Sequence, residues 1–190
     1  MMKTEEKILE AALDVVQEKT ISGTRMHHIA EKAEVVQSNV HYYYKTKKDL
    51  LKALQEKVLQ HCLDIRARDR ERIGDTFEEQ MDVFMKQKKH FITKEQKYDY
   101  AELDFWMQGR IEDKIREDFQ KSFQIWREEI REVIGRFFPN LSSEKLEYFP
   151  CIIVSMLEGA SIQYLIDPDA FDIDQYFEYC KLTIFSMLGI

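Results

Sequence analysis

Residues that break helices are scarce along this sequence, and their scarcity restricts the folds open to it. The 190 residues include six Gly and three Pro, too few for the many turns of a β-sheet protein of this length. Apolar residues recur instead at intervals of three and four, for example Ile8, Ala11, Ala12, Val15 and Val16. That spacing places them on one face of a helix. The sequence therefore predicts an all-α protein.

Caps and turn residues divide the chain into helices. Thr4, Thr24 and Thr46 each precede a helical pattern and could cap it through the side-chain hydroxyl. Gly23 and Pro139 mark breaks between patterns. About nine helices result, with approximate ranges 4–19, 25–33, 37–44, 47–70, one around 77–85, 100–108, 111–138, one from 143 and one from 174.

Charge is unevenly distributed along the chain. The net charge is −7, yet the segment from Lys19 to Lys52 holds seven Lys and Arg against three acids. That segment is therefore +4, and the remainder is −11. An acidic body with a small basic patch fits a protein that contacts nucleic acid at one end.

We expect a cytoplasmic protein with no membrane span, metal or cofactor. No run of about 18 consecutive apolar residues occurs, and the N-terminal residues lack the apolar centre of a signal peptide. Cys62, Cys151 and Cys180 lie far apart and form no CxxC pair. Reduced thiols are therefore expected rather than disulfides or a zinc site.

The segment between residues 25 and 44 predicts a helix-turn-helix unit, because two short helical patterns are joined there by a tight connection. Such a unit lays its second helix in the DNA major groove, where Gln and Asn can pair with base edges. Residues flanking the unit can hold phosphates. The predicted DNA contacts are Gln37, Ser38, Asn39, His41 and Tyr42 on the second helix, and Thr24, Arg25 and Lys47 beside it.

The segment GTRMHHIAEKAEVVQSNVHYYYKTKKDLL, Gly23 to Leu51, resembles the DNA-binding domain of the tetracycline-repressor (TetR) family of bacterial regulators. It shares with that family a threonine, an Ile-Ala pair, an alanine before the turn, an aromatic cluster and a lysine. The resemblance implies that Tyr43 and Tyr44 pack the recognition helix against its neighbours. It also implies that Thr24 and Lys47 contact phosphates.

Four positions depart from the family pattern, and all of them lie in or beside the expected reading surface. Glu34 replaces a usual glycine, so the left-handed turn is either absent or strained here. Val36 replaces a Ser or Thr that often caps the recognition helix. Ser38 and His41 replace a frequent glycine and a tyrosine. The operator sequence therefore stays open.

The resemblance also implies two domains, a helix-turn-helix domain at residues 1–50 and a helical ligand-binding and dimerisation domain at 51–190. A single DNA-reading module needs a partner for affinity, so we expect a homodimer on a palindromic operator. The last two helices carry more apolar surface than one protomer can bury, although they could simply be central to its core. The predicted interface residues are Ile152, Ser155, Met156, Gly159, Phe177, Ile184, Phe185 and Leu188.

A cavity for a small-molecule inducer within the C-terminal bundle is likewise implied by the resemblance. Aromatic residues are abundant there, so a hydrophobic or aromatic inducer is expected, although most of these side chains could equally be core. The predicted pocket residues are His61, Met81, Phe84, Trp106, Phe119, Phe123, Trp126 and Tyr164.

These observations together predict a ligand-responsive transcriptional regulator, a repressor released from its operator by the inducer. The alternative is an all-helical interaction protein or an enzyme that does not bind DNA. An enzyme is disfavoured because no GxSxG, HExxH, P-loop or GxGxxG motif occurs. Neither the inducer nor the regulated genes follow from the sequence.

Overall fold

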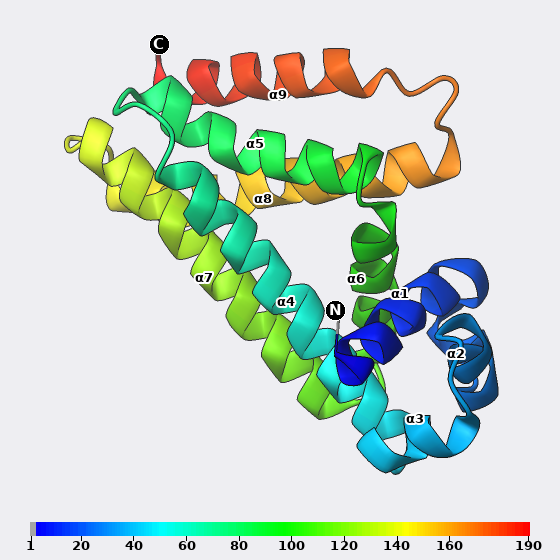
Figure 1. Cartoon of the computed structure of the whole chain (residues 1–190). Helices are drawn as coiled ribbons and strands as arrows, with labels where there is room; N and C mark the ends of the chain where they lie inside the picture. The colour runs from blue at the N-terminus through cyan, green and yellow to red at the C-terminus, as the bar shows by residue number, and fades with distance from the viewer. Residues whose placement is uncertain (1–2) are drawn as a thin grey trace. The chain divides into compact units, whose positions relative to one another are not determined.

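A computed structural model describes residues 3–190, which form an all-α protein (Figure 1). Within that range the chain has nine helices and no strand, as the sequence predicts. The helices are α1 (Thr4–Gly23), α2 (Met26–Lys32), α3 (Gln37–Tyr43), α4 (Lys47–Arg70), α5 (Phe77–Thr93), α6 (Gln96–Gln108), α7 (Asp113–Phe137), α8 (Ser143–Ile166) and α9 (Ile173–Leu188).

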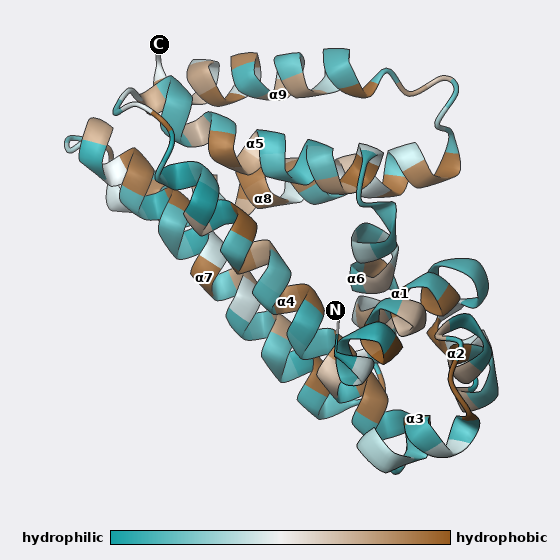
Figure 2. Cartoon of the chain, viewed as in Figure 1, coloured by the Kyte–Doolittle hydropathy of each residue, from teal (hydrophilic) through white to brown (hydrophobic). Residues whose placement is uncertain are grey.

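The helices are packed into two compact units. Unit 1 comprises the chain up to Leu63 together with Glu95–Phe119, and unit 2 comprises Asp64–Lys94 together with Gln120–Ile190. Helices α4 and α7 each contribute residues to both units. Along each of them, hydrophobic residues are interspersed among hydrophilic ones (Figure 2). This division differs from the expected domains, because unit 1 adds residues 51–63 and 95–119 to the helix-turn-helix segment.

Unit 1 is built around α1, which packs against both α2 and α6, while α2 packs against α3. The apolar stripe of α1 forms one wall of its core, as the three- and four-residue spacing predicts. The fully buried apolar side chains of unit 1 are Ile8, Ala12, Leu13, Ile29, Val40, Leu50, Leu54, Val58, Ala101 and Phe105.

The end of α1 is kinked. Thr20 has φ 59° and ψ 168°, a combination that a β-branched residue rarely adopts and that costs about 1–3 kcal/mol. We expected the helix to stop at about Lys19, before Thr20, with a turn supplied by Gly23; the kink is at Thr20, and Gly23 has no positive φ in the structure. The residue with the unfavourable positive φ is therefore a threonine, and contacts with its surroundings must hold it in that conformation.

Capping confirms some predicted helix starts and corrects others. Thr46 caps α4, because its hydroxyl accepts from the Asp49 N–H at 3.1 Å and its own N–H donates to the Asp49 carboxylate at 2.9 Å. Ser142 caps α8 in the same way, accepting from the Lys145 N–H at 3.3 Å. Thr4 is not a cap, because α1 already begins at Thr4 and its cap is Lys3, without a side-chain bond.

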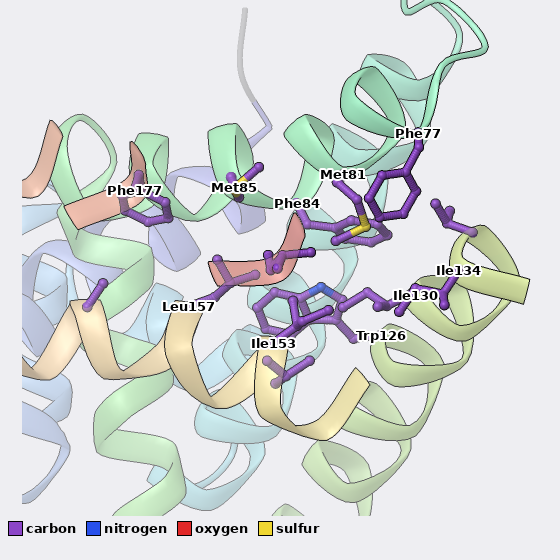
Figure 3. Packing of buried hydrophobic residues seen from close by; sticks show 14 of the residues in the cluster. Phe77, Met81, Phe84, Met85, Trp126, Ile130, Ile134, Ile153, Leu157 and Phe177 are labelled. Atoms are coloured by element: carbon purple, nitrogen blue, oxygen red, sulfur yellow. The ribbon is translucent and has the colours of Figure 1, made fainter. Parts of the chain in front are cut away.

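The core of unit 2 lies among α5, α7, α8 and α9 (Figure 3). Figure 3 shows the indole of Trp126 beside Ile153 and Leu157, with Phe84 and Met81 facing it from α5. Phe77 at the start of α5 also packs edge-on against Phe138, with ring centroids 5.0 Å apart. Dense packing of this kind makes every large side chain in the cluster sensitive to truncation.

Helix α8 is the most apolar helix of unit 2, and by length and composition alone it could cross a membrane. We expected no segment apolar enough to span a membrane, and the length and composition of α8 correct that expectation. In the structure α8 packs on α5 and α9. It also contains Pro150 and a buried Glu158. These features are those of a core helix, because a buried carboxylate paired within the bundle has no counterpart in a lipid-facing segment.

Candidate nucleic-acid interface

The recognition helix α3 is short and is held to unit 1 by its inward side chains. Val40 is fully buried, and Tyr44, the residue after the helix, is also buried. The Tyr44 hydroxyl donates to the Glu5 carboxylate of α1 at 3.4 Å. Burial, with Glu5 nearby, raises the pKa of Tyr44 above its ordinary value. The phenol therefore stays a neutral hydrogen-bond donor that ties α3 to α1.

The opposite face of α3 is polar and open to solvent. Gln37, Ser38 and Asn39 are exposed in its first turn, and the Tyr42 side chain is 75% exposed. These groups can donate to or accept from base edges, and their position in the first turn is where a recognition helix meets the groove. The structure thus brings four of the five predicted α3 residues onto one free surface.

His41, the fifth residue, is half-buried and lies between two polar neighbours. Its Nε2 is 3.4 Å from the Gln37 amide nitrogen, and its Nδ1 is 3.3 Å from the Lys45 carbonyl. If Nδ1 donates to Lys45, Nε2 accepts from Gln37, which fixes one neutral tautomer. His41 therefore orients Gln37 and joins the end of α3 to the following turn.

The three flanking residues are engaged within the protein. Arg25 is exposed, and its guanidinium donates to the carbonyls of Ser22 at 2.7 Å and Thr24 at 3.0 Å. Lys47 donates to the Ile21 carbonyl at 2.6 Å, and burial, with Arg25 nearby, lowers its pKa. Thr24 is fully buried and its hydroxyl donates to the Thr20 carbonyl at 2.8 Å. Because it has no exposed surface, Thr24 is unavailable for the expected phosphate contact in this structure.

Three further exposed residues, Tyr43, Val36 and Lys45, lie on or beside this face of α3 and were not among the predicted DNA contacts. Tyr43 was expected to pack inward, but it is 39% exposed and its ring meets Tyr42 edge-on, with centroids 5.2 Å apart. Val36 is 64% exposed at the N-terminal end of α3, where it could meet a thymine methyl. Lys45 is exposed in the turn after α3, and its place in a basic turn was the signal that could have identified it.

The turn before α3 is strained. Glu34 has φ 52°, so the left-handed conformation of the family turn is kept without the glycine that suits it. Val36 makes no side-chain cap to α3, as expected from a residue without a hydroxyl. The Glu34 carboxylate pairs with Lys7 of α1 at 3.2 Å, which helps to hold the turn.

A network of ion pairs fastens α1 to α4 and α6 within unit 1. Lys57 of α4 pairs with Glu10 at 3.0 Å and also with Glu6. Lys97 of α6 pairs with Glu10 at 2.6 Å and with Asp14 at 3.2 Å. These partly exposed pairs hold together the helices next to the helix-turn-helix, α2 and α3, although each pair contributes only modestly to stability.

The predicted pocket residues divide between the two units. His61, Trp106 and Phe119 belong to unit 1, where His61 bonds Glu95 at 2.7 Å and stacks on Tyr98. Met81, Phe84 and Trp126 are buried in the core of unit 2, and Phe123 and Tyr164 are partly buried against it. Their role in holding a ligand therefore stays a prediction.

Unit 2 also contains buried charges that were not predicted. The Arg66 guanidinium donates to Gln87 at 3.0 Å and to Glu129 at 2.5 Å, and it lies 5.2 Å from the centre of the Trp126 ring. Lys88 pairs with Glu158 at 2.6 Å. These groups occupy inward helical positions among aromatic residues, and that position is the sequence signal that could have revealed them.

The predicted interface residues fall into three groups. Ile152 and Ser155 are exposed on α8, and Met156, Gly159, Phe185 and Leu188 are partly exposed. Phe177 and Ile184 are buried in the core of their own protomer, so they present little surface to a second copy, and their place in an interface stays a prediction. Helix α9 points these two large side chains inward because they fill the space against α5 and α8.

Within residues 3–190, no group of three or more His, Cys, Asp or Glu side chains is arranged to hold a metal ion. The three cysteines are free thiols, and burial raises the pKa of Cys180.

The fold and the exposed polar helix define a helix-turn-helix transcriptional regulator, and comparisons with known proteins agree. Residues 8–54 match the family model described as bacterial regulatory proteins, tetR family. The HTH-type transcriptional regulator YvdT of Bacillus subtilis, itself described as uncharacterized, is 24% identical over 186 residues, covering 96% of this chain and 92% of YvdT.

Solved structures share the whole fold. A transcriptional regulator from Saccharomonospora viridis, determined in complex with choline, superposes with a TM-score of 0.83 at 18% identity, covering 95% of this chain and 94% of that one. A TetR transcription regulator from Haloarcula marismortui has a TM-score of 0.78 at 18% identity, with 97% and 96% covered. Residues 8–54 thus resemble the DNA-binding domain of tetR-family regulators, and the whole chain has the fold of solved transcriptional regulators.

Proposed function

We propose that this regulator acts in the cytoplasm as a homodimeric repressor that reads a palindromic operator with α3 in the major groove of each half-site. The observation that carries the proposal is the exposed first turn of α3, with Gln37, Ser38 and Asn39 on a helix anchored by Val40. Tyr42 and Lys45 extend that surface toward the phosphates. A rigid helix with a free polar face is what direct readout requires.

An apolar stripe on α8 supports a homodimer. Tyr148, Ile152, Ile162 and Ile166 are exposed at 43–78%, and with Ser155 and Gly159 they recur at alternating intervals of four and three. That repeat forms a continuous seam along one face of a helix and suits packing against a second helix. Exposed Tyr179 and Leu182 on α9 add to the apolar surface. A second copy of this chain would cover the seam by two-fold symmetry.

The interior of unit 2 supports response to a small ligand that carries both apolar and polar groups. The indole N–H of Trp126 is buried and has no hydrogen-bond partner among the described residues. A buried unsatisfied donor costs about 1–3 kcal/mol, which a ligand acceptor would relieve. The relative from Saccharomonospora viridis binds choline. A polar ligand would have to replace the ion pairs that Arg66 and Lys88 make inside unit 2. The response of the protein to that ligand would be measured as a change of operator affinity at fixed salt.

Selection of bound duplexes from a random pool tests the reading of DNA. The wild-type chain should enrich a palindrome. Asn39→Ala should cost about 1–3 kcal/mol of discrimination at one base pair of each half-site. Lys45→Ala should weaken binding to all sequences and reduce the salt slope by about 1.

Lys86→Ala is the matched control, because Lys86 is 73% exposed on α5 and pairs only with Asp82 of the same helix. This variant should bind as the wild type does. Failure of the wild-type chain to enrich any duplex would remove the proposal, as would an equal loss of affinity in the control and in Lys45→Ala.

A further inference from the structure

The peptide units that follow the kinked Thr20 are held from two other helices. The Ile21 N–H donates to the Asp104 carboxylate of α6 at 2.8 Å. The Ile21 carbonyl accepts from the Lys47 ammonium of α4 at 2.6 Å. Asp104 and Lys47 therefore bind the backbone N–H and the backbone carbonyl of the same residue, Ile21. The Ile21 side chain is also buried.

The bonds from Asp104 and Lys47 to Ile21 oppose the strain at Thr20. Without an external restraint, a threonine at φ 59° would relax toward an allowed conformation, and the chain after it would change direction. The Thr24 hydroxyl and N–H both donate to the Thr20 carbonyl, at 2.8 and 3.1 Å. That local bond closes the turn, whereas the bonds from Asp104 and Lys47 connect the turn to α6 and α4.

These two bonds lie where they can affect how α3 meets DNA. Ile21 precedes α2 by five residues, and Lys47 begins α4 directly after the turn that ends α3. The Lys47–Ile21 bond therefore joins the two ends of the helix-turn-helix unit. Asp104 joins those ends to α6, which follows α5 of unit 2 after only Lys94 and Glu95.

We infer that Asp104 is a positioning residue for operator recognition, acting with Lys47 to fix the Ile21 peptide and so the direction in which α2 and α3 leave α1. The inference rests on the proposed reading of DNA by α3. Asp104 itself makes no contact with DNA in this role.

The test compares three full-length variants with the wild type on the duplex that the wild type selects and on a scrambled duplex. Asp104→Ala removes the acceptor. Asp104→Asn keeps a side-chain oxygen that can accept from the Ile21 N–H. Glu117→Ala is the matched control, because this acid on α7 is exposed and has only a weak 3.8 Å ion pair.

Asp104→Ala should lose about tenfold affinity for the selected duplex, with little loss for the scrambled one and an unchanged salt slope, because no phosphate contact is removed. Asp104→Asn should recover most of the affinity. A variant that was merely less folded would instead lower the active fraction and affect both duplexes alike.

Amide hydrogen exchange without DNA provides the second readout. Exchange at Ile21 and along α2 should quicken in Asp104→Ala but not in Asp104→Asn or Glu117→Ala. The inference is overturned if Asp104→Ala matches the control in exchange, or if it reads the selected duplex as the wild type does. If no duplex is selected by the wild type, the proposed function fails while the exchange result still decides the role of Asp104.

Discussion

In unit 1, Gln37 and Asn39 lie exposed on a short helix that buried Val40 anchors, whereas in unit 2 Arg66 and Lys88 are buried and paired with carboxylates. An exposed amide such as that of Asn39 can bond to another molecule at little cost to the fold, and the Gln37 amide, 3.4 Å from His41, is exposed beside it. Buried charges must be paired inside the protein, because desolvation without a partner is unfavourable. The comparison teaches that α3 of unit 1 presents polar side chains to solvent, while unit 2 encloses charged side chains and pairs them inside the protein.

The largest effect should come from the core of unit 2. Phe84→Ala removes a fully buried ring and should lower the free energy of unfolding by about 3–5 kcal/mol, through lost burial and a residual cavity. Chemical denaturation of the full chain measures it. Tyr42→Ala, on the exposed face of α3, is the control and should change stability by less than about 0.5 kcal/mol. Similar losses in both would break the contrast between the two regions.

The next effect concerns the exposed seam of α8. Ile162→Glu places a charge at a position that is 53% exposed in the protomer but buried in the proposed dimer. Sedimentation should show a monomer, and operator affinity should fall about 100-fold or more, since two linked reading units are lost together. Ile111→Glu, at an apolar position 79% exposed in unit 1, should remain dimeric. A dimeric Ile162→Glu would exclude this seam as the interface.

A smaller effect tests the incomplete cap of α3. Val36→Ser supplies a hydroxyl at an N-terminal cap position whose backbone is already extended, at φ −71° and ψ 145°. Stability should rise by about 1 kcal/mol, because an unsatisfied N–H of the first turn gains an acceptor. Thermal unfolding beside Val36→Ala separates capping from loss of the valine. No gain of Ser over Ala would show that the first turn of α3 is satisfied in another way.

The smallest effect is a pH dependence in unit 1. Burial raises the pKa of Glu10, but hydrogen bonds and charges from Lys97 and Lys57 outweigh it and leave the pKa below its ordinary 4.5. The carboxylate therefore stabilises the fold above its unfolded pKa, and this stabilisation is lost as the pH falls through the lowered folded value.

Glu10→Gln should accordingly be less stable than the wild type near neutral pH, by under about 1 kcal/mol for these partly exposed pairs. The difference should shrink as the pH falls below 4.5. Denaturant midpoints across that range measure it, with Glu117→Gln as the exposed control. A difference that stays constant with pH would mean that Glu10 acts through packing rather than charge.

Much of unit 1 followed from local patterns. Thr46 with Asp49, and the buried Val40, lie where caps and periodicity indicate. The errors arose where neighbours compete for space. Tyr43 and Tyr44 are adjacent and chemically identical, yet only Tyr44 is buried, because successive side chains point in different directions and that of Tyr44 reaches Glu5 of α1.

Unit 2 was harder to foresee. The sequence left open whether the aromatic residues line a pocket or form the core, and it did not predict that charged side chains such as Arg66 and Glu158 are buried in the same unit. Helical spacing shows that a residue faces inward, and it does not show which partner it meets. Phe177 and Ile184 likewise fill the protomer core, while Tyr179 and Leu182 on the same helix are exposed.

By itself the sequence determined the helical class, most helix boundaries and the polar surface of α3, because caps, turns and periodicity act within a few residues along the chain. Only the tertiary structure decided that Thr20 carries the kink, that Lys47 and Asp104 hold Ile21, and which face of α8 stays uncovered. These features depend on contacts between residues as many as 83 positions apart, and such distant contacts leave no signature in local sequence.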